Sequence, residues 1–180
     1  MLKKVYYLLL FVFFTSCSDS DIYKTKSNEY ASKSGNFIAK FPDEPVKNVI
    51  ENNIGTDKYE TTIYATSLGP NKVFSVTYDD LPTNLIGSTT DEELYDRMIQ
   101  NVLFRLKDAF KVEHKKEINQ HGLKGVFYIL EFKDKSLRSR GYISMKLFRH
   151  KNRFYNISYN GKNDKNIDPF INSFRLIKTN

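Results

Sequence analysis

The sequence has few of the residues from which disulfide bonds and metal sites are built. It contains a single cysteine, Cys17, so no intramolecular disulfide bond can form. Its three histidines, His114, His121 and His150, show none of the short paired spacings that metal sites use. We therefore predict no bound metal and expect each histidine at the surface or in a turn. A metal site built from distant carboxylates is the alternative.

The motifs of the common enzyme classes are absent as well. The sequence has no Gly-x-Ser-x-Gly elbow, no phosphate-cradling glycine loop and no His-Glu-x-x-His helix. Two carboxylate pairs have structural explanations, because Asp79-Asp80 ends a predicted strand and Glu92-Glu93 begins a predicted helix. The sequence thus predicts no catalytic residue and no cofactor.

Composition favours a single domain without a nucleic-acid partner. The 180 residues are 40% hydrophobic and 14% aromatic, which is enough for one real core and excludes disorder throughout the chain. The formal net charge of +7 includes Lys3 and Lys4 at the N-terminus, and lysine far outnumbers arginine. A mild excess of lysine is not typical of a phosphate-binding surface, so no nucleic-acid partner is predicted.

What the chain does carry at its N-terminus is the pattern of an export signal. The segment from Met1 to Lys4 is basic, the segment from Val5 to Phe14 is an unbroken run of ten apolar residues, and Thr15-Ser16 are small. A membrane-spanning helix needs about 20 apolar residues. Residues 1–16 are therefore predicted to be a signal peptide and not a membrane span.

The end of this segment, Phe14-Thr15-Ser16-Cys17, resembles the lipobox of bacterial lipoproteins. The resemblance implies cleavage before Cys17 and a lipid such as palmitate on its thiol, which anchors the protein to a membrane. Phe14 stands where the family more often has leucine, but it keeps the site apolar. We expect a lipid-anchored protein of the bacterial cell envelope, at the outer membrane of a Gram-negative cell. The alternative is a soluble exported protein with an incidental cysteine.

Polar composition separates this anchor from the folded part. Residues 17–35 are rich in serine, lysine, aspartate and asparagine without an apolar period, which predicts a flexible tether. Residues 36–177 are predicted to form one globular domain, and residues 178–180 a tail.

The domain is predicted to begin with antiparallel strands and to continue with one long helix. Pro42, Gly55 and Gly69 mark the turns between four strands, which are 37–41, 46–54, 59–67 and 73–78. Thr90 and Glu93 form a capping box at the start of a helix whose apolar residues recur from Leu94 to Phe110 with helical spacing.

A second set of strands is predicted after the helix. Val126 to Leu130 is a continuous apolar run, typical of an inner strand covered on both faces and lying under the helix. A hairpin follows, with strands 140–149 and 154–159, and Asp168-Pro169 opens a short C-terminal helix. Strands, a long helix, more strands and a short helix predict the α+β class.

Several short segments resemble the PsbP-like superfamily. They are Phe37-Ile38-Ala39-Lys40-Phe41-Pro42, Gly122-Leu123-Lys124-Gly125, Arg153-Phe154-Tyr155 and Ser173-Phe174-Arg175-Leu176. This superfamily includes the photosystem protein PsbP, a Ran-binding nuclear import factor and many small bacterial lipoproteins. The resemblance implies an α/β/α sandwich with a central antiparallel sheet, and a docking role in place of catalysis. It assigns no functional residue in this chain.

The strongest local anomaly is a basic hairpin. Eight basic residues between Lys133 and Arg153 face one acid, Asp134. Strand alternation predicts that charged and aromatic side chains share one surface for an anionic partner, with the residues Arg138, Arg140, Tyr142, Lys146 and Phe148. The alternative is a solvated hairpin whose charges protect a sheet edge from aggregation.

These observations favour a membrane-anchored, non-catalytic binding or assembly module. Its expected partner is an envelope protein, anionic lipid or polysaccharide. An enzyme with an unrecognised site and a carrier of a small ligand between helix and sheet are the alternatives. Convergent titratable groups in a pocket would favour the enzyme, and a shallow aromatic and basic face would favour the binding module.

Overall fold

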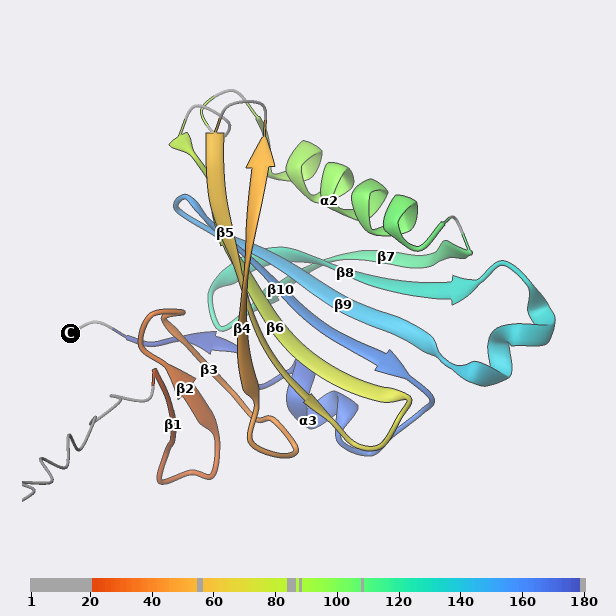
Figure 1. The fold of residues 1–180 in the computed structure, drawn as a ribbon, viewed down its shortest axis with the longest axis horizontal. Coiled ribbons are helices and arrows are strands. Elements are labelled where there is room, and N and C mark those ends of the chain that lie inside the picture. Colours follow the sequence, from red (N-terminus) through yellow and green to blue (C-terminus); the bar gives the residue numbers. More distant parts are fainter. Residues whose placement is uncertain (1–20, 55–56, 84–86, 88, 108, 179–180) are drawn as a thin grey trace, which may run out of the picture.

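The computed structural model describes residues 21–54, 57–83, 87, 89–107 and 109–178 (Figure 1). The predicted signal peptide, residues 1–16, and the predicted lipidation site, Cys17, lie outside the described residues. No helix in the described part of the chain is long and apolar enough to cross a bilayer.

A seven-stranded antiparallel sheet forms the body of the protein (Figure 1). Its strand order is β4-β5-β6-β10-β9-β8-β7. The strands are β4 (Val46–Ile54), β5 (Asp57–Ser67), β6 (Lys72–Asp80), β7 (Phe110–Gln120), β8 (Leu123–Phe132), β9 (Tyr142–His150) and β10 (Arg153–Gly161). Short hairpin turns join most neighbours, and the β7–β8 turn uses His121 and Gly122, both with positive φ (52° and 84°). Such backbone angles suit a tight two-residue hairpin, so the turn predicted at His121-Gly122 is confirmed.

A second, four-stranded sheet joins the two ends of the described chain. Its order is β1-β2-β3-β11, and every pair is antiparallel. The strands are β1 (Ile22–Lys24), β2 (Tyr30–Ser32), β3 (Phe37–Ala39) and β11 (Arg175–Leu176).

The predicted flexible tether of residues 17–35 is therefore wrong from Asp21 onward. Tyr30, Ala31 and Ser32 are buried, and β2 lies between β1 and β3. Three-residue strands are too short for a visible period, and these strands depend on pairing with their neighbours in the small sheet. The predicted first strand, near Phe37, also belongs to this small sheet and not to the large one.

One face of the large sheet is covered by α2 (Asp91–Arg105). The predicted capping box is present, because the Thr90 hydroxyl accepts from the Glu93 backbone N–H and the Glu93 carboxylate accepts from the Thr90 N–H. Tyr95 and Ile99 are the buried residues of the helix. They pack with apolar side chains of β8, β9 and β10, namely Val126, Tyr128, Leu130, Ile143, Met145, Leu147 and Phe154.

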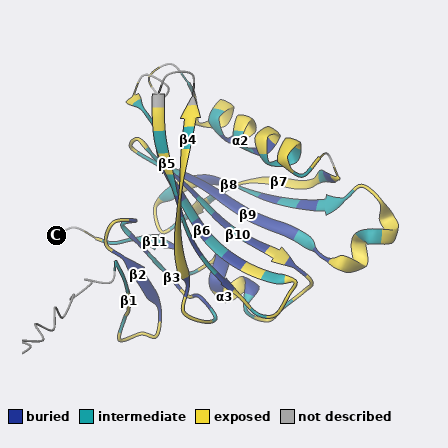
Figure 2. Cartoon of the chain, viewed as in Figure 1, coloured by how far each residue is buried: buried dark blue, intermediate teal, exposed yellow. Residues whose placement is uncertain are grey.

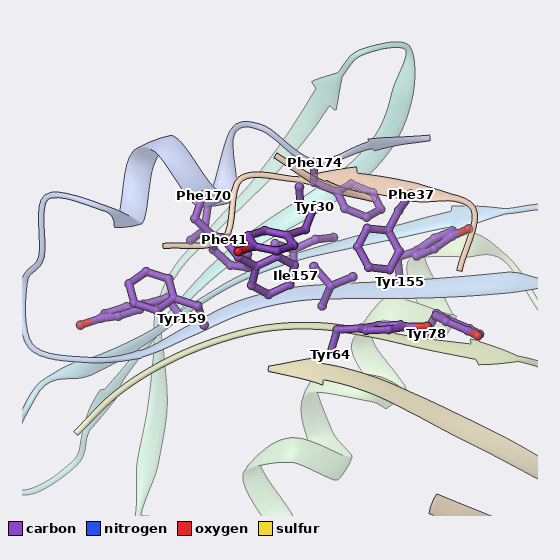
Figure 3. Close-up of a cluster of buried hydrophobic side chains, with 14 of the residues drawn as sticks. Tyr30, Phe37, Phe41, Tyr64, Tyr78, Tyr155, Ile157, Tyr159, Phe170 and Phe174 are labelled. Carbon is purple, nitrogen blue, oxygen red and sulfur yellow. The ribbon is translucent and has the colours of Figure 1, made fainter. Parts of the chain in front are cut away.

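The opposite face is covered by the small sheet and by α3 (Ile167–Ile171). The core there is aromatic and includes Phe37, Tyr64, Tyr155 and Phe174 (Figure 3). Burial concentrates in the central strands and the small sheet, whereas β4 and the outer side of α2 are exposed (Figure 2). The α+β class is confirmed, but the layer opposite α2 consists mainly of strands, where an α/β/α sandwich predicts helices.

The strand around Val126 to Leu130 differs from its prediction in one respect. β8 pairs with β7 and β9 and is an inner strand, although the middle position belongs to β10. Val126, Tyr128 and Leu130 are buried under α2, whereas Phe127 and Ile129 on the other face are only half-buried. Cover on both faces is thus wrong for this strand, because the small sheet lies over the middle of the large sheet, against β5, β6, β9 and β10.

Candidate functional site

The partly open face of the sheet near α3 forms a groove. One hollow, of about 350 Å³, is lined by residues that include His114, Phe127, Ser144 and Asp168. A second, of about 530 Å³, adjoins it. The two hollows share Lys116, Ile118, Lys146 and Asn172. We call the two together the Lys146 groove.

Lys146 is the most unusual side chain of this groove. It lies on β9 and is only 8% exposed, although lysine is rarely buried. Its Nζ donates to Oε1 of Gln120 at 2.5 Å and to Oδ1 of Asn172 at 2.7 Å. Both acceptors are neutral amides, and no ion pair joins Lys146 to a described carboxylate. A charged amine has three N–H donors, so one remains beyond these two bonds.

The protein holds Lys146 firmly between two elements. Gln120, at the end of β7, uses its amide nitrogen to donate to the carbonyls of Ile171 at 3.1 Å and Phe174 at 2.9 Å. Asn172 is the residue that ends α3. The ammonium therefore sits where the end of β7, the middle of β9 and the C-terminal segment meet, and its position depends on all three.

The electrostatics of the groove favour an anion. Burial lowers the pKa of Lys146 to about 8, and the charge of Asp168 opposes this shift. At neutral pH the side chain is thus mainly charged. Lys116 and His114 line the smaller hollow with one acid, Asp168, and Glu117 lines the larger hollow. A hollow with a buried ammonium and a second lysine can hold a carboxylate or a phosphate group.

The three histidines lie along this side of the molecule. His114 lines the smaller hollow of the groove and His121 the larger one. His150 and His121 line a neighbouring hollow of about 920 Å³ with Arg175 and Lys178. No group of histidine, cysteine, aspartate and glutamate side chains in the described residues is arranged to hold a metal.

The structure does not place the five residues predicted for an anionic partner on one surface. Phe148 is fully buried and stacks on Phe174, with ring centroids 5.7 Å apart. Tyr142 is half-buried against Tyr159. The prediction is wrong because the small sheet and α3 cover the face of β9 that was expected to meet solvent. Lys146 remains accessible only through the groove.

The two arginines of that prediction lie elsewhere. Arg138 and Arg140 belong to η1 (Lys135–Arg140), a 3-10 helix between β8 and β9, and both are exposed. Arg138 lies 3.5 Å from the Glu131 carboxylate. The charges of this segment are exposed, as the alternative predicts, but β8, β9 and β10 are inner strands of the large sheet, so the hairpin protects no sheet edge.

The carboxylate pairs have the structural positions expected of them. Asp79 is buried, and burial raises its pKa while a hydrogen bond from the Thr61 hydroxyl opposes that shift. Asp80 receives two hydrogen bonds from the Arg153 guanidinium, at 2.5 and 2.6 Å. The other pair lies in the first turn of α2. Neither pair lines the Lys146 groove.

Sequence reasoning found Lys146 but not its surroundings. Gln120 and Asn172 are each 26 residues away in the chain, and neither has a pattern of its own. The sequence offered one signal. Lys146 shares a face of its strand with Tyr142, Ser144 and Phe148, and a charged residue is not expected on a face that is buried.

Comparisons with known proteins support the fold. A solved structure of cyanobacterial PsbP, CyanoP from Synechocystis sp. PCC 6803, matches with a TM-score of 0.56 and 10% identity, and it covers 83% of this chain and 91% of that chain. The protein PA94 of Pseudomonas aeruginosa matches with a TM-score of 0.38 and 13% identity, over 64% of this chain and 83% of that chain. No family model and no curated protein matches. The likeness to CyanoP supports the predicted PsbP-like fold, and at this identity it concerns the fold alone.

Proposed function

We propose that this chain is a lipid-anchored protein of the bacterial envelope whose PsbP-like domain is a non-catalytic binding module. Its anchor is a lipid on Cys17, at the outer membrane of a Gram-negative cell. The export pattern before Cys17 supports the anchor. The likeness to CyanoP supports a PsbP-like fold. The resemblance of the sequence to the PsbP-like superfamily implies a docking role.

The binding site of this module is the Lys146 groove, and its ligand is a carboxylate or phosphate group on an envelope component. One observation carries this assignment, namely a buried ammonium that has neutral hydrogen-bond partners and no ion pair with a described residue. Burying a charge without a counter-charge is unfavourable, and an anion in the groove would relieve that penalty. Lys116 in the same lining adds to the attraction.

A titration with inorganic phosphate and with acetate, followed by backbone amide NMR shifts, tests the site. We expect shifts at Lys146, Gln120 and Asn172. Lys146→Met should weaken binding about tenfold or more, because hydrogen bonds to charged groups contribute about 1.5–3 kcal/mol. Lys133→Met, which removes an exposed lysine outside the groove, is the matched control. Equal affinity in the two variants would overturn the assignment.

Metabolic labelling with a fatty acid tests the anchor. The wild-type protein should be labelled and membrane-bound, and Cys17→Ser should release it from the membrane. An unlabelled wild-type chain would refute the anchor without affecting the groove.

An enzyme is the second candidate, because a lysine with a pKa of about 8 suits a nucleophile. The two amide acceptors of Lys146 oppose this role, since they favour the protonated amine. Reduction with borohydride in the presence of an uncharged aldehyde separates the two functions, because such an aldehyde is not attracted to an anion site. Preferential modification of Lys146 over the other lysines would favour the enzyme.

A carrier of a small ligand between helix and sheet is the third candidate. The place for it is a hollow of about 510 Å³ at the first turn of α2, lined by residues that include Asp91, Tyr95, Lys115 and Val126. A co-purified small molecule lost from a Tyr95→Ala variant would favour the carrier.

A further inference from the structure

The folded domain begins much closer to Cys17 than the sequence predicts. The Asp21 carboxylate accepts hydrogen bonds from the Ser34 backbone N–H at 2.9 Å and hydroxyl at 2.7 Å, and Lys47 pairs with it at 2.9 Å. The hydroxyl of Tyr64, a fully buried core residue, donates to it as well. Burial opposes ionisation, but the hydrogen bonds outweigh it and hold the pKa of Asp21 below its usual range. Asp21 is therefore part of the fold.

Only three residues separate Cys17 from this fixed point. An extended chain advances at most about 3.3–3.6 Å per residue, so Cys17 and Asp21 are at most about 14 Å apart. The headgroup region on each side of a bilayer is about 5–8 Å thick. A lipid on Cys17 would consequently hold the surface around Asp21 beside the headgroups, whereas the predicted tether would have allowed the domain to move freely.

The surface around Asp21 has the chemistry of a membrane contact. Among the described residues, β1 is an edge strand of the small sheet, and it continues directly from Asp21. Tyr23 is 41% exposed, and Lys33 lies over its ring at 5.9 Å. Lys24 is exposed on the opposite face of the same edge strand, where it lies over the Tyr30 ring at 5.6 Å, and Lys26 is exposed in the turn that follows. A bilayer that meets the edge of β1 can be reached from both faces. Exposed tyrosine and lysine are the side chains that favour the interface of an anionic bilayer.

The acids of this segment do not cancel its lysines. Asp21 is paired with Lys47, and Glu29 is held by two hydrogen bonds of 2.7 Å from Arg175. Those bonds lower the pKa of Glu29 to about 2. Neither Lys24, Lys26 nor Lys33 forms an ion pair with a described residue. Asp19, between the anchor and the fold, adds one negative charge against three positive ones.

We propose that β1 and its flanking turns, residues 21–34, form a membrane-facing surface on which Tyr23, Lys24, Lys26 and Lys33 contact the headgroups of anionic phospholipids. This inference rests on the proposed lipid on Cys17. It gives the domain one fixed orientation, with the Lys146 groove held at a defined place relative to the bilayer.

Tryptophan fluorescence tests this surface, because the chain contains no tryptophan. Tyr23→Trp places a single fluorophore on the proposed surface, and Lys26→Trp is a second probe in case the first variant does not fold. Phe104→Trp is the control, since Phe104 is 79% exposed on α2. The full lipidated chain is reconstituted into vesicles of brominated phosphatidylethanolamine and phosphatidylglycerol. We expect strong quenching in the first two chains and little in the third.

Lysine variants then test the charge contribution. Lys24, Lys26 and Lys33 changed together to Gln in the Tyr23→Trp chain should lower the quenching by about half or more, because each lysine near an anionic bilayer contributes about a fivefold factor. Changing Lys133, Lys135 and Lys151 to Gln removes the same charge from the basic hairpin and should leave the quenching unchanged.

Mass spectrometry of the N-terminal peptide shows whether Cys17 is acylated. It therefore distinguishes a failure of the proposed anchor from a failure of the membrane-facing surface. An unmodified Cys17 would overturn the proposed anchor and this inference with it. An acylated Cys17 with equal quenching in the Tyr23→Trp, Lys26→Trp and Phe104→Trp chains would overturn the membrane-facing surface alone. Equal quenching in the two lysine triple variants would show that Lys24, Lys26 and Lys33 do not contribute to the membrane-facing surface.

Discussion

The two faces of the large sheet are covered in different ways. On one face, a single helix of fifteen residues and the strands beneath it bury ten side chains, of which four are aromatic. On the other, the small sheet and α3 enclose sixteen buried residues, eleven of which are aromatic. The first cover comes from one continuous segment, and the second is assembled from both ends of the described chain.

This difference separates local from long-range structure. The helical face depends on a period and a cap that lie within one segment, whereas the aromatic face exists only when β1, β2, β3 and β11 have met. Aromatic rings suit such a junction because a few large side chains can fill the space between short strands. The aromatic face should therefore carry more of the stability.

The largest expected effect is the loss of a ring from the aromatic face. Phe174 is fully buried and its ring lies within about 6 Å of those of Phe37, Phe148 and Tyr155. Phe174→Ala should lower the free energy of unfolding by about 3–5 kcal/mol, measured by urea denaturation. Phe104→Ala, on the exposed side of α2, should change it by less than about 0.5 kcal/mol. Similar losses of stability in the two variants would contradict the assignment of Phe174 to the core.

The two faces of β8 offer a sharper test within one strand. Leu130 is fully buried under α2, so Leu130→Ala should cost about 2–5 kcal/mol. Phe127 is half-buried in the Lys146 groove, so Phe127→Ala should cost only about 1–2 kcal/mol despite its larger side chain. A larger loss for Phe127→Ala would restore the predicted cover on both faces. The denaturant midpoints of the two variants distinguish cover on one face of β8 from cover on both.

The pH dependence of stability reports on Lys146. Its folded pKa, about 8, lies below the ordinary value of 10.5, so between these values the unfolded chain binds more protons. Stability should rise with pH across this window, and anion binding should fall as the ammonium loses its proton. We expect the free energy of unfolding to rise by about 1–2 kcal/mol across this window. A site without water would give a larger rise, but water enters the groove. Lys146→Met should remove this slope, whereas Lys133→Met should keep it.

The smallest expected effect concerns α2, whose capping box lies within four consecutive residues. Thr90→Ala removes the side-chain acceptor of the capping box and should destabilise the protein by about 1 kcal/mol. Thr90→Ser retains a hydroxyl and should be close to neutral. Helix content from circular dichroism and a urea midpoint measure both. A loss as large as that of Phe174→Ala would mean that α2 is as critical as the aromatic face.

Prediction from the sequence succeeded where neighbouring residues act on one another. The Thr90–Glu93 box, the turn at His121-Gly122 and the hairpin of β9 and β10 depend on contacts within a few residues. It failed for Tyr30 to Ser32, because a three-residue strand has no period to detect. It also failed for Phe148, because strand alternation identifies which residues share a face but not what covers that face.

The features of the candidate site likewise fall into those visible in the sequence and those set by contacts between distant segments. Lys146 stood out in the sequence as part of a basic cluster, but its burial, its amide partners and its depressed pKa follow from the approach of Gln120 and Asn172. Arg138 and Arg140, its neighbours in that cluster, lie in η1 instead. Residues that cluster in the sequence do not form one surface here, because two lie in η1 and Lys146 lies in the middle of β9.

The sequence by itself determined the α+β class, the long helix with its cap and the pattern of an export signal, because each depends on side chains close together in the chain. The tertiary structure alone decided that residues from Asp21 onward are folded, that strands cover the second face and that a lysine is buried beside α3. These features arise from contacts between segments far apart in sequence. The free energy of such contacts belongs to the pair of segments, so neither segment shows it alone.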